Sequence, residues 1–300
     1  MSSSRDGLVL LNKPPEMTSF QALKPVKQRL QTGKIGHTGT LDRFADGLLI
    51  AAGGACSRFA PYVTALPKEY YAVLQLGIET DTLDPEGEIT ASSECPSFEA
   101  LEHAATQFRG EFMQTPPVYS AIKLEGRRAS SRKRAGDDPR LEARPVTVYE
   151  LELGRYETET GRLNLRVLCS KGTYVRALAR DLSYAAGSCA HLVALRRTAV
   201  GGFRLEDAVH PDEFDRERDL VPPARFLPKL EGITPLVVEP EIAERMLHGV
   251  ALRHPAFEPL RDTVSTDGVY AALTPDERLI AVFERRDGSW KYRFVKAIES

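Results

Sequence analysis

One short stretch of this 300-residue chain combines residue types that could do chemistry. It reads Gly36-His37-Thr38-Gly39-Thr40-Leu41-Asp42 and is followed by the apolar run Gly47-Leu48-Leu49-Ile50. A single carboxylate such as Asp42 can serve as a nucleophile or as a general base. Aspartate is also a favoured helix N-cap, in which case the apolar run would simply be buried structure. This stretch alone leaves both interpretations open.

Several other chemistries are excluded by spacing. Thr32-Gly33-Lys34-Ile35 looks like the end of a P-loop, but Gln28 stands where the first glycine is needed and Ile35 where serine or threonine is needed. The acids between residues 81 and 86 lack the alternate spacing of a calcium loop. The four cysteines form no C-x-x-C pair, which argues against a zinc site and a disulfide framework. We therefore expect no metal, no small-molecule cofactor and reduced thiols.

Composition and charge indicate a cytoplasmic protein with a polyanionic partner. The chain is 42% hydrophobic and 27% charged, which is typical of a soluble globular protein, and no apolar stretch is long enough to span a membrane. The net charge is only −2, but basic residues concentrate in 24–43, 123–144 and 171–204, whereas 79–102 and 206–219 are acidic. Such segregation is the electrostatic footprint of nucleic-acid binding, although solvated surface charge would look the same.

The pattern of apolar residues predicts an α+β fold with a mostly antiparallel sheet and flanking helices. We expect strands at 7–11 and 70–77, a hairpin of 145–153 and 162–169 around Gly161, and helices at 18–30, 98–108 and 174–186. Asp84-Pro85-Glu86-Gly87 is typical of a turn.

Two breaks suggest the domain organisation. The apolar pattern disappears between about 125 and 144, which predicts an insertion, either functional or disordered, in a catalytic domain of residues 1–230. A proline-rich break at 220–228 precedes short strands at 268–273, 278–284 and 291–297, so residues 231–300 are expected to form a small β-rich module.

Taken together, the motifs resemble the bacterial tRNA pseudouridine synthase B family. The 36–42 stretch with Gly47-Leu48-Leu49 looks like the catalytic loop of that family, and the other segments agree in order and spacing. These segments are Asn12-Lys13-Pro14, Lys68-Glu69-Tyr70, residues 114–123, residues 169–176, Ala190-His191-Leu192 and Leu195-Arg196-Arg197. The resemblance is strong over about residues 7–205. The last part of the chain resembles the family's PUA-type RNA-binding domain only weakly.

The resemblance implies a function and a set of site residues. The family converts uridine-55 in the T-loop of tRNA into pseudouridine by flipping the base and exchanging a C–N for a C–C glycosidic bond. By position, Asp42 would be the catalytic carboxylate, Tyr70 the aromatic that stacks on the uracil and helps to move a proton, and Arg176 the partner that lowers the pKa of the acid. The expected substrate-binding residues are His37, Tyr70, Tyr174, Leu195, Lys13 and, in an RNA-gripping thumb at about 123–145, Arg132, Lys133 and Arg134.

Two positions depart from the family pattern. Arg43 stands where the family usually has proline after the catalytic aspartate, and Glu16 where glycine is common. Arg43 could contact a phosphate or compete with Arg176 for Asp42. The resemblance also leaves open whether Asp42 attacks the sugar or removes the 2′ hydrogen, and whether a tRNA-folding activity accompanies the modification. Apart from tRNA through its T-arm, we expect no partner: the protein should be a monomer that does not touch a membrane.

Overall fold

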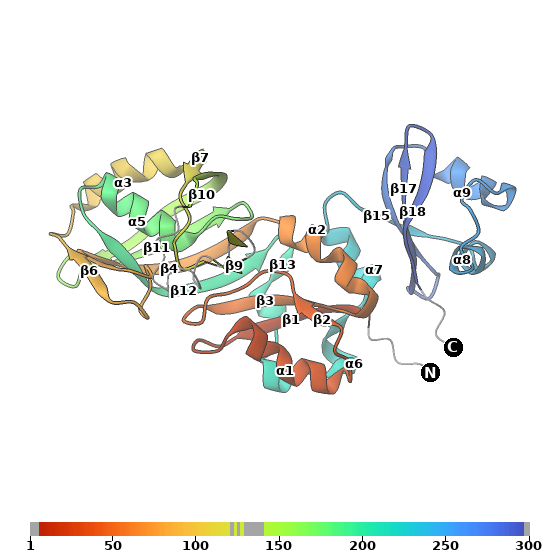
Figure 1. Ribbon diagram of the computed structural model, residues 1–300, viewed down its shortest axis with the longest axis horizontal. Helices are drawn as coiled ribbons and strands as arrows, with labels where there is room; N and C mark the ends of the chain where they lie inside the picture. Colours follow the sequence, from red (N-terminus) through yellow and green to blue (C-terminus); the bar gives the residue numbers. More distant parts are fainter. Residues whose placement is uncertain (1–5, 121–122, 125–126, 129–140, 297–300) are drawn as a thin grey trace.

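The computed structural model describes residues 6–120, 123–124, 127–128 and 141–296 (Figure 1). Its largest element is a ten-stranded mixed sheet in the order β14-β1-β3-β12-β4-β11-β10-β7, with β2 beside β3 and β13 beside β12. Its strands are β1 Gly7–Lys13, β2 Ile35–His37, β3 Asp46–Gly53, β4 Lys68–Leu76, β7 Gly110–Gln114, β10 Arg144–Glu157, β11 Arg162–Cys169, β12 Ala190–Val200, β13 Phe203–Arg204 and β14 Leu220–Val221. β12 pairs in parallel with β3, and the other strand pairings within the described part of this sheet are antiparallel. The predicted α+β class is confirmed.

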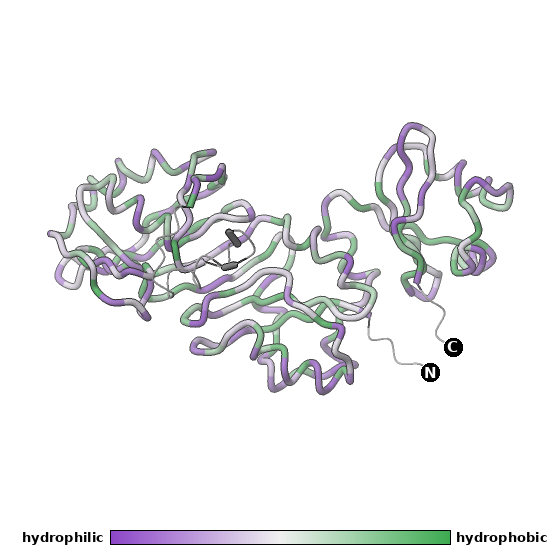
Figure 2. The backbone as a smooth tube through the Cα atoms, in the orientation of Figure 1, coloured by the Kyte–Doolittle hydropathy of each residue, from purple (hydrophilic) through white to green (hydrophobic). Residues whose placement is uncertain are grey.

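Helices cover both faces of the sheet. The reason is that successive side chains along β1 and along β3 are apolar and point to opposite faces. Val9 and Leu11 of β1 point into one cluster of buried side chains, which the helices α1, α3 and α5 complete. Leu8 and Leu10 point into a second cluster on the other face, with residues of η1, α2 and α7. Successive side chains of a strand point to opposite faces, so a strand that is apolar throughout needs cover on both sides. Figure 2 shows hydrophobic residues along these strands and hydrophilic ones along the outer loops.

The helical segments are short, and sequence signals mark the ends of several. The bounds are α1 Ser19–Arg29, η1 Gly54–Phe59, α2 Ala60–Ala65, α3 Phe98–Ala105, η2 Thr106–Phe108, α5 Val175–Ala185, η3 Leu205–Asp207, η4 Pro211–Glu213, α6 Arg216–Asp219, α7 Pro223–Phe226 and η5 Leu227–Lys229. Thr18 caps α1 in a capping box with Gln21, as the predicted helix start requires. Tyr174 and Ala186 flank α5, in agreement with the predicted helix.

Two hairpins project from the sheet. β5 Ile78–Thr80 and β6 Ile89–Ser92 carry part of the acidic segment. β8 Lys123–Leu124 and β9 Arg127–Arg128 belong to the predicted thumb. The remaining thumb residues that we singled out, Arg132, Lys133 and Arg134, lie outside the described residues.

The last part of the chain forms a second sheet in the order β15-β16-β17-β18, at the right of Figure 1. Its elements are β15 Thr234–Val237, α8 Pro240–Leu247, η6 Pro255–Phe257, α9 Glu258–Thr263, β16 Gly268–Leu273, β17 Leu279–Arg286 and β18 Ser289–Val295. The three predicted strands are present, whereas β15 and the two helices were not predicted. Ala271 and Leu273 pack in the same cluster as Leu8 and Phe226, so the two sheets share a buried contact.

Candidate active site

Asp42 lies in the loop between β2 and β3, which we call the Asp42 loop (residues 38–45). A strand, not a helix, follows this loop, so the helix-cap interpretation of Asp42 is wrong. Gly47 at the start of β3 has φ +100°, and a Cβ there would collide with the backbone of Arg197 on β12. Only glycine adopts that conformation and allows that approach without strain. The apolar run after Asp42 is therefore a buried central strand that anchors the loop.

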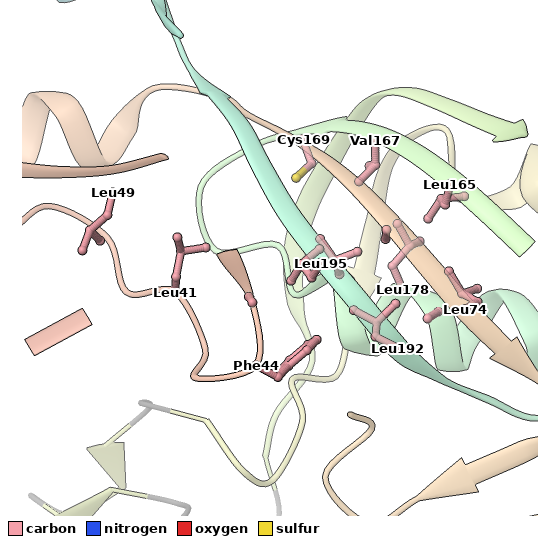
Figure 3. Close-up of a cluster of buried hydrophobic side chains, with 14 of the residues drawn as sticks. Leu41, Phe44, Leu49, Leu74, Leu165, Val167, Cys169, Leu178, Leu192 and Leu195 are labelled. Atoms are coloured by element: carbon pink, nitrogen blue, oxygen red, sulfur yellow. The ribbon is translucent and has the colours of Figure 1, made fainter. Parts of the chain in front are cut away.

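The Asp42 loop is tied to its surroundings next to Asp42. The buried Ser19 hydroxyl donates to the carbonyl of Leu41 (3.0 Å) and accepts from its N–H (2.9 Å). Arg197 Nε donates to the carbonyl of Leu48 (2.7 Å), and its Nη2 donates to the carbonyl of Gly39 (3.1 Å). Figure 3 shows Leu41 among the buried side chains of the core. These contacts hold the backbone on both sides of the carboxylate.

Arg176 connects Asp42 with a second acid. Its Nε lies 2.9 Å from Oδ2 of Asp42, and its Nη1 lies 3.1 Å from Oδ2 of Asp84. The guanidinium also donates to the carbonyls of Thr82 (2.7 Å) and Tyr119 (3.0 Å). The Arg176 side chain is 4% exposed and that of Asp84 7%, whereas the Asp42 side chain is 38% exposed. Arg176 and Asp84 therefore form a buried support, and Asp42 keeps a free edge.

The environment of Asp42 acts on its pKa in two opposite directions. Burial raises the pKa of this carboxyl above its ordinary value, the ion pair with Arg176 opposes that rise, and the nearby charge of Asp84 adds to it. Burial wins because moving a carboxylate out of water disfavours its charged form more than one guanidinium, itself shared with Asp84, restores. The expected pairing of Arg176 with Asp42 is present and acts to lower the pKa of the carboxyl, as expected, while burial sets the net direction.

A pocket of about 270 Å³ opens in front of Asp42. Tyr70 of β4, Tyr174 and Arg176 at the N-terminal end of α5, and Leu195 of β12 line it with the Asp42 loop. The side chain of Gln114 holds Tyr174 in place, because its amide oxygen accepts from the Tyr174 N–H (2.8 Å) and its amide nitrogen donates to the Tyr174 carbonyl (3.2 Å). Burial raises the pKa of both Tyr70 and Tyr174, so both phenols are neutral at physiological pH. Four of the predicted site residues thus meet Asp42 at one pocket.

Two predicted substrate-binding residues lie elsewhere. Lys13 is fully buried, and its ammonium donates to the carbonyls of Pro14 (2.9 Å), Met17 (2.7 Å) and Arg43 (3.3 Å). Burial lowers the pKa of Lys13 to about 8. Lys13 therefore holds the Asp42 loop from inside the protein and is not exposed for contact with RNA. His37 ends β2 just before the pocket-lining residues, and burial together with Arg197 lowers its pKa.

Three residues of this site were not assigned a role from the sequence. Asp84 was interpreted only as part of a turn. Arg197 belongs to a quoted motif but looks like a strand residue, and its contacts with the Asp42 loop depend on the pairing of β12 with β3. Lys68 lines the pocket, donates to the carbonyls of Thr64 and Leu66 (both 2.5 Å), and has a pKa lowered to about 8 by burial. No periodicity of the sequence marks such long-range contacts.

The described residues show neither a membrane-spanning helix nor a cluster of metal ligands. None of the helices in this part of the chain is long and apolar enough to cross a membrane. The same residues contain no group of three or more His, Cys, Asp or Glu side chains placed to hold a metal ion.

Comparison with known proteins decides the family. Residues 27–175 match the family model described as TruB family pseudouridylate synthase, N-terminal domain. A protein of Corynebacterium aurimucosum named tRNA pseudouridine synthase B is 38% identical over 291 residues, which cover 94% of this chain and 93% of that protein. The chain belongs to the TruB family of pseudouridylate synthases. Two further TruB relatives carry the same name. That of Treponema denticola is 42% identical over 69% of this chain and 63% of its own length, and that of Borreliella burgdorferi is 41% identical over 68% and 72%.

Solved structures support the same fold for this TruB member. A Cbf5-Nop10-Gar1 complex contains a chain with a TM-score of 0.66 and 21% identity, and the match covers 98% of this chain and 84% of that one. An archaeal box H/ACA Nop10-Cbf5 complex gives a TM-score of 0.65 at 20% identity, covering 99% and 86%. At these identities the likeness establishes the fold. The predicted pseudouridine-synthase-like architecture and the family resemblance are both confirmed.

Proposed function

We propose that this protein isomerises uridine-55 in the T-loop of tRNA to pseudouridine. The observation that carries the proposal is the Asp42 carboxylate, paired with Arg176 at 2.9 Å and open to a pocket lined by Tyr70 and Leu195. Membership in the TruB family, and the name tRNA pseudouridine synthase B of the relatives, supply the substrate and reaction class.

The reaction suits a site with one such carboxylate. The bond between ribose C1′ and uracil N1 must break, the uracil must turn, and C5 must bond to C1′. C5 then loses its proton and N1 gains one, so the base is rearranged without oxidation or reduction. An ionised carboxylate serves either as a nucleophile toward C1′ or as a base toward the 2′ hydrogen. In both routes Asp42 reacts as the anion. The role of Arg176 is to favour that anion against the effect of burial.

The pocket also suits a single extruded nucleoside. A volume of about 270 Å³ lies just below the range for drug-sized ligands, which begins at about 300 Å³. In our proposal the flipped uracil stacks on Tyr70, contacts Leu195 and Tyr174, and leaves its ribose near Asp42. Lys68 and Arg197 add positive charge at the pocket, which favours the approach of a nucleotide phosphate.

The proposal is tested with unmodified tRNA transcript. The purified protein is incubated with the transcript without added metal or cofactor, and pseudouridine is mapped along the RNA. We expect modification at position 55 by the wild-type protein, and retained tRNA binding with loss of isomerisation for Asp42→Asn, because the amide keeps the shape but not the charge. Turnover of Asp42→Asn within tenfold of wild type, or modification elsewhere only, would refute the assignment. Three expectations stay predictions. They are a division into catalytic and PUA-like domains at 230/231, a cytoplasmic location and a monomeric state.

A further inference from the structure

Arg43, the residue directly after Asp42, joins the Asp42 loop to two segments that are distant in sequence. Its Nη2 lies 3.3 Å from Oε2 of Glu16, and its Nε donates to the carbonyl of the same residue (3.2 Å). Its Nη1 lies 3.7 Å from Oε1 of Glu86. The two positions that depart from the family pattern, Arg43 and Glu16, are thus each other's partners. The guanidinium faces these acids instead of competing with Arg176 for Asp42.

The segments that carry Glu16 and Glu86 are each connected to the Asp42 region by further contacts besides their ion pairs with Arg43. On one side, Lys13 donates to the carbonyl of Met17, next to Glu16, and to the carbonyl of Arg43 itself. The side chain and the backbone of Arg43 are therefore fastened to the same β1–α1 loop. Glu16 adopts φ +62°, a left-handed conformation that is strained for a residue with a Cβ, in the position from which it meets Arg43.

On the other side, Glu86 belongs to the turn that supports Arg176. The N–H of Glu86 donates to Oδ1 of Asp84 (3.1 Å), and Oδ2 of Asp84 pairs with Arg176, which pairs with Asp42. Asp42, Arg43, Glu86, Asp84 and Arg176 therefore form a closed ring of one peptide link and four side-chain contacts. A ring constrains the distance between Asp42 and Arg176 more than their own ion pair does, because the pair cannot move without disturbing the remaining contacts.

Charge argues against the alternative in which Arg43 binds an RNA phosphate. Arg43 lines a cleft of about 540 Å³ whose other charged residues are all acids, namely Glu16, Asp81, Glu86 and Glu88. Four carboxylates around one guanidinium give this rim a negative field, which repels a phosphate. The guanidinium of Arg43 thus finds its ionic and hydrogen-bond partners, Glu16 and Glu86, within the protein itself.

We propose that Arg43 is a positioning residue, which, together with Glu16 and Glu86, holds the Asp42 loop at the distance from Arg176 that the reaction needs. This inference rests on the proposed function and concerns the same site. The side chains of Arg43, Glu16 and Glu86 are 55%, 68% and 42% exposed. An exposed ion pair shifts an equilibrium by about fivefold at most, and the longer pair with Glu86 (3.7 Å) by about twofold, so the two pairs together predict an effect of about threefold to tenfold.

The first experiment separates the chemical step from binding. Single-turnover rates at saturating unmodified tRNA, and tRNA dissociation constants over a salt series, are measured for wild type, Arg43→Gln, Glu16→Gln and the double variant. We expect Arg43→Gln to lower the rate about threefold to tenfold while affinity and salt slope stay within twofold, and the double variant to be no slower than the slower single variant. Arg43→Lys should recover part of the rate. Arg155→Gln, which breaks an exposed pair with Glu157 (3.1 Å), is the matched control and should match wild type.

The outcomes that overturn the inference are distinct from failure of the proposed function. An unchanged rate with weaker binding and a salt slope reduced by about one would make Arg43 a phosphate contact. Effects of Arg43→Gln and Glu16→Gln that multiply in the double variant would show that the two residues act independently. Inactive wild-type protein would refute the proposed function. In that case, amide hydrogen exchange of residues 40–45 still tests whether Arg43 holds the Asp42 loop. Arg43→Gln should accelerate this exchange at least threefold, and unchanged exchange would refute the role of Arg43 in holding the loop.

Discussion

Replacing Asp84 by asparagine tests whether the buried acid behind Arg176 supports the candidate active site. The Arg176–Asp84 contact of 3.1 Å joins two side chains that are almost completely buried. Asparagine preserves the shape but exchanges a charged hydrogen bond for a neutral one, which is weaker by about 1–2 kcal/mol. If that loss is felt in the transition state, the single-turnover rate falls about 5- to 30-fold. Binding of tRNA should change little, because Asp84 does not line the pocket.

The same variant makes a directional prediction about pH. The pKa of Asp42 is raised, in part by the charge of Asp84, and the proposed reaction needs the Asp42 anion. The rate should therefore rise with pH through an acid limb centred above the ordinary pKa of aspartate. Removing the charge of Asp84 lowers the pKa of Asp42, so the limb should move toward lower pH although the maximal rate falls.

The assay is a pH series of single-turnover rates, with Asp81→Asn as the control. Asp81 is an exposed acid of the same turn whose Oδ1 accepts from the N–H of Glu88 (3.0 Å). We expect Asp81→Asn to match wild type in maximal rate and in the position of the acid limb. An Asp84→Asn rate within twofold of wild type, or an acid limb that stays in place or moves to higher pH, would refute the reasoning.

Three further predictions concern other parts of the chain. Tyr70→Phe should keep tRNA affinity but lower the single-turnover rate, since only the hydroxyl is lost; an unchanged rate would confine Tyr70 to stacking. Glu16→Gly should be more stable in denaturant unfolding than Glu16→Ala by about 1 kcal/mol, because both lose the pair with Arg43 but only alanine keeps a Cβ at φ +62°; equal stabilities would contradict the strain. Replacing Arg132, Lys133 and Arg134 together by alanine should weaken tRNA binding and reduce its salt slope by about 2, at about 0.7 per phosphate contact. Parallel salt lines with equal affinities would exclude the thumb assignment.

Much of the fold of the first 230 residues could be predicted because local signals and tertiary structure agree there. The capping box at Thr18 and the turn at Gly161, which has φ +69°, mark real element ends. β12 was not predicted as a strand, although two of its motifs were recognised. It is a central strand with irregular pairing to β4 between Leu192 and Ala194 and between Arg197 and Ala199, so its apolar residues follow no clean alternation.

The helices of the last module were missed for a different reason. α8 and α9 have only eight and six residues, and each has a proline in its first turn, Pro240 and Pro259, so neither shows a helical period long enough to stand out from the sequence. In the candidate active site, the family motifs pointed to Asp42 and to four of the residues that line its pocket. They could not show that Lys13 faces inward, or that burial outweighs Arg176 in setting the pKa of Asp42, because both depend on the packed surroundings.

The position of β12 between β3 and β4 also sets the order in which this protein can acquire its site during synthesis. β12 brings Leu195 and Arg197 beside the strands that carry the Asp42 loop and Tyr70. Those strands leave the ribosome first, but they do not pair with each other in the finished sheet. Until about residue 200 has emerged, the pairings of β12 that join β3 to β4 cannot form. The candidate active site is thus completed late, by one strand whose pairings are long-range in sequence and which must form before Leu195 and Arg197 reach the Asp42 loop and Tyr70.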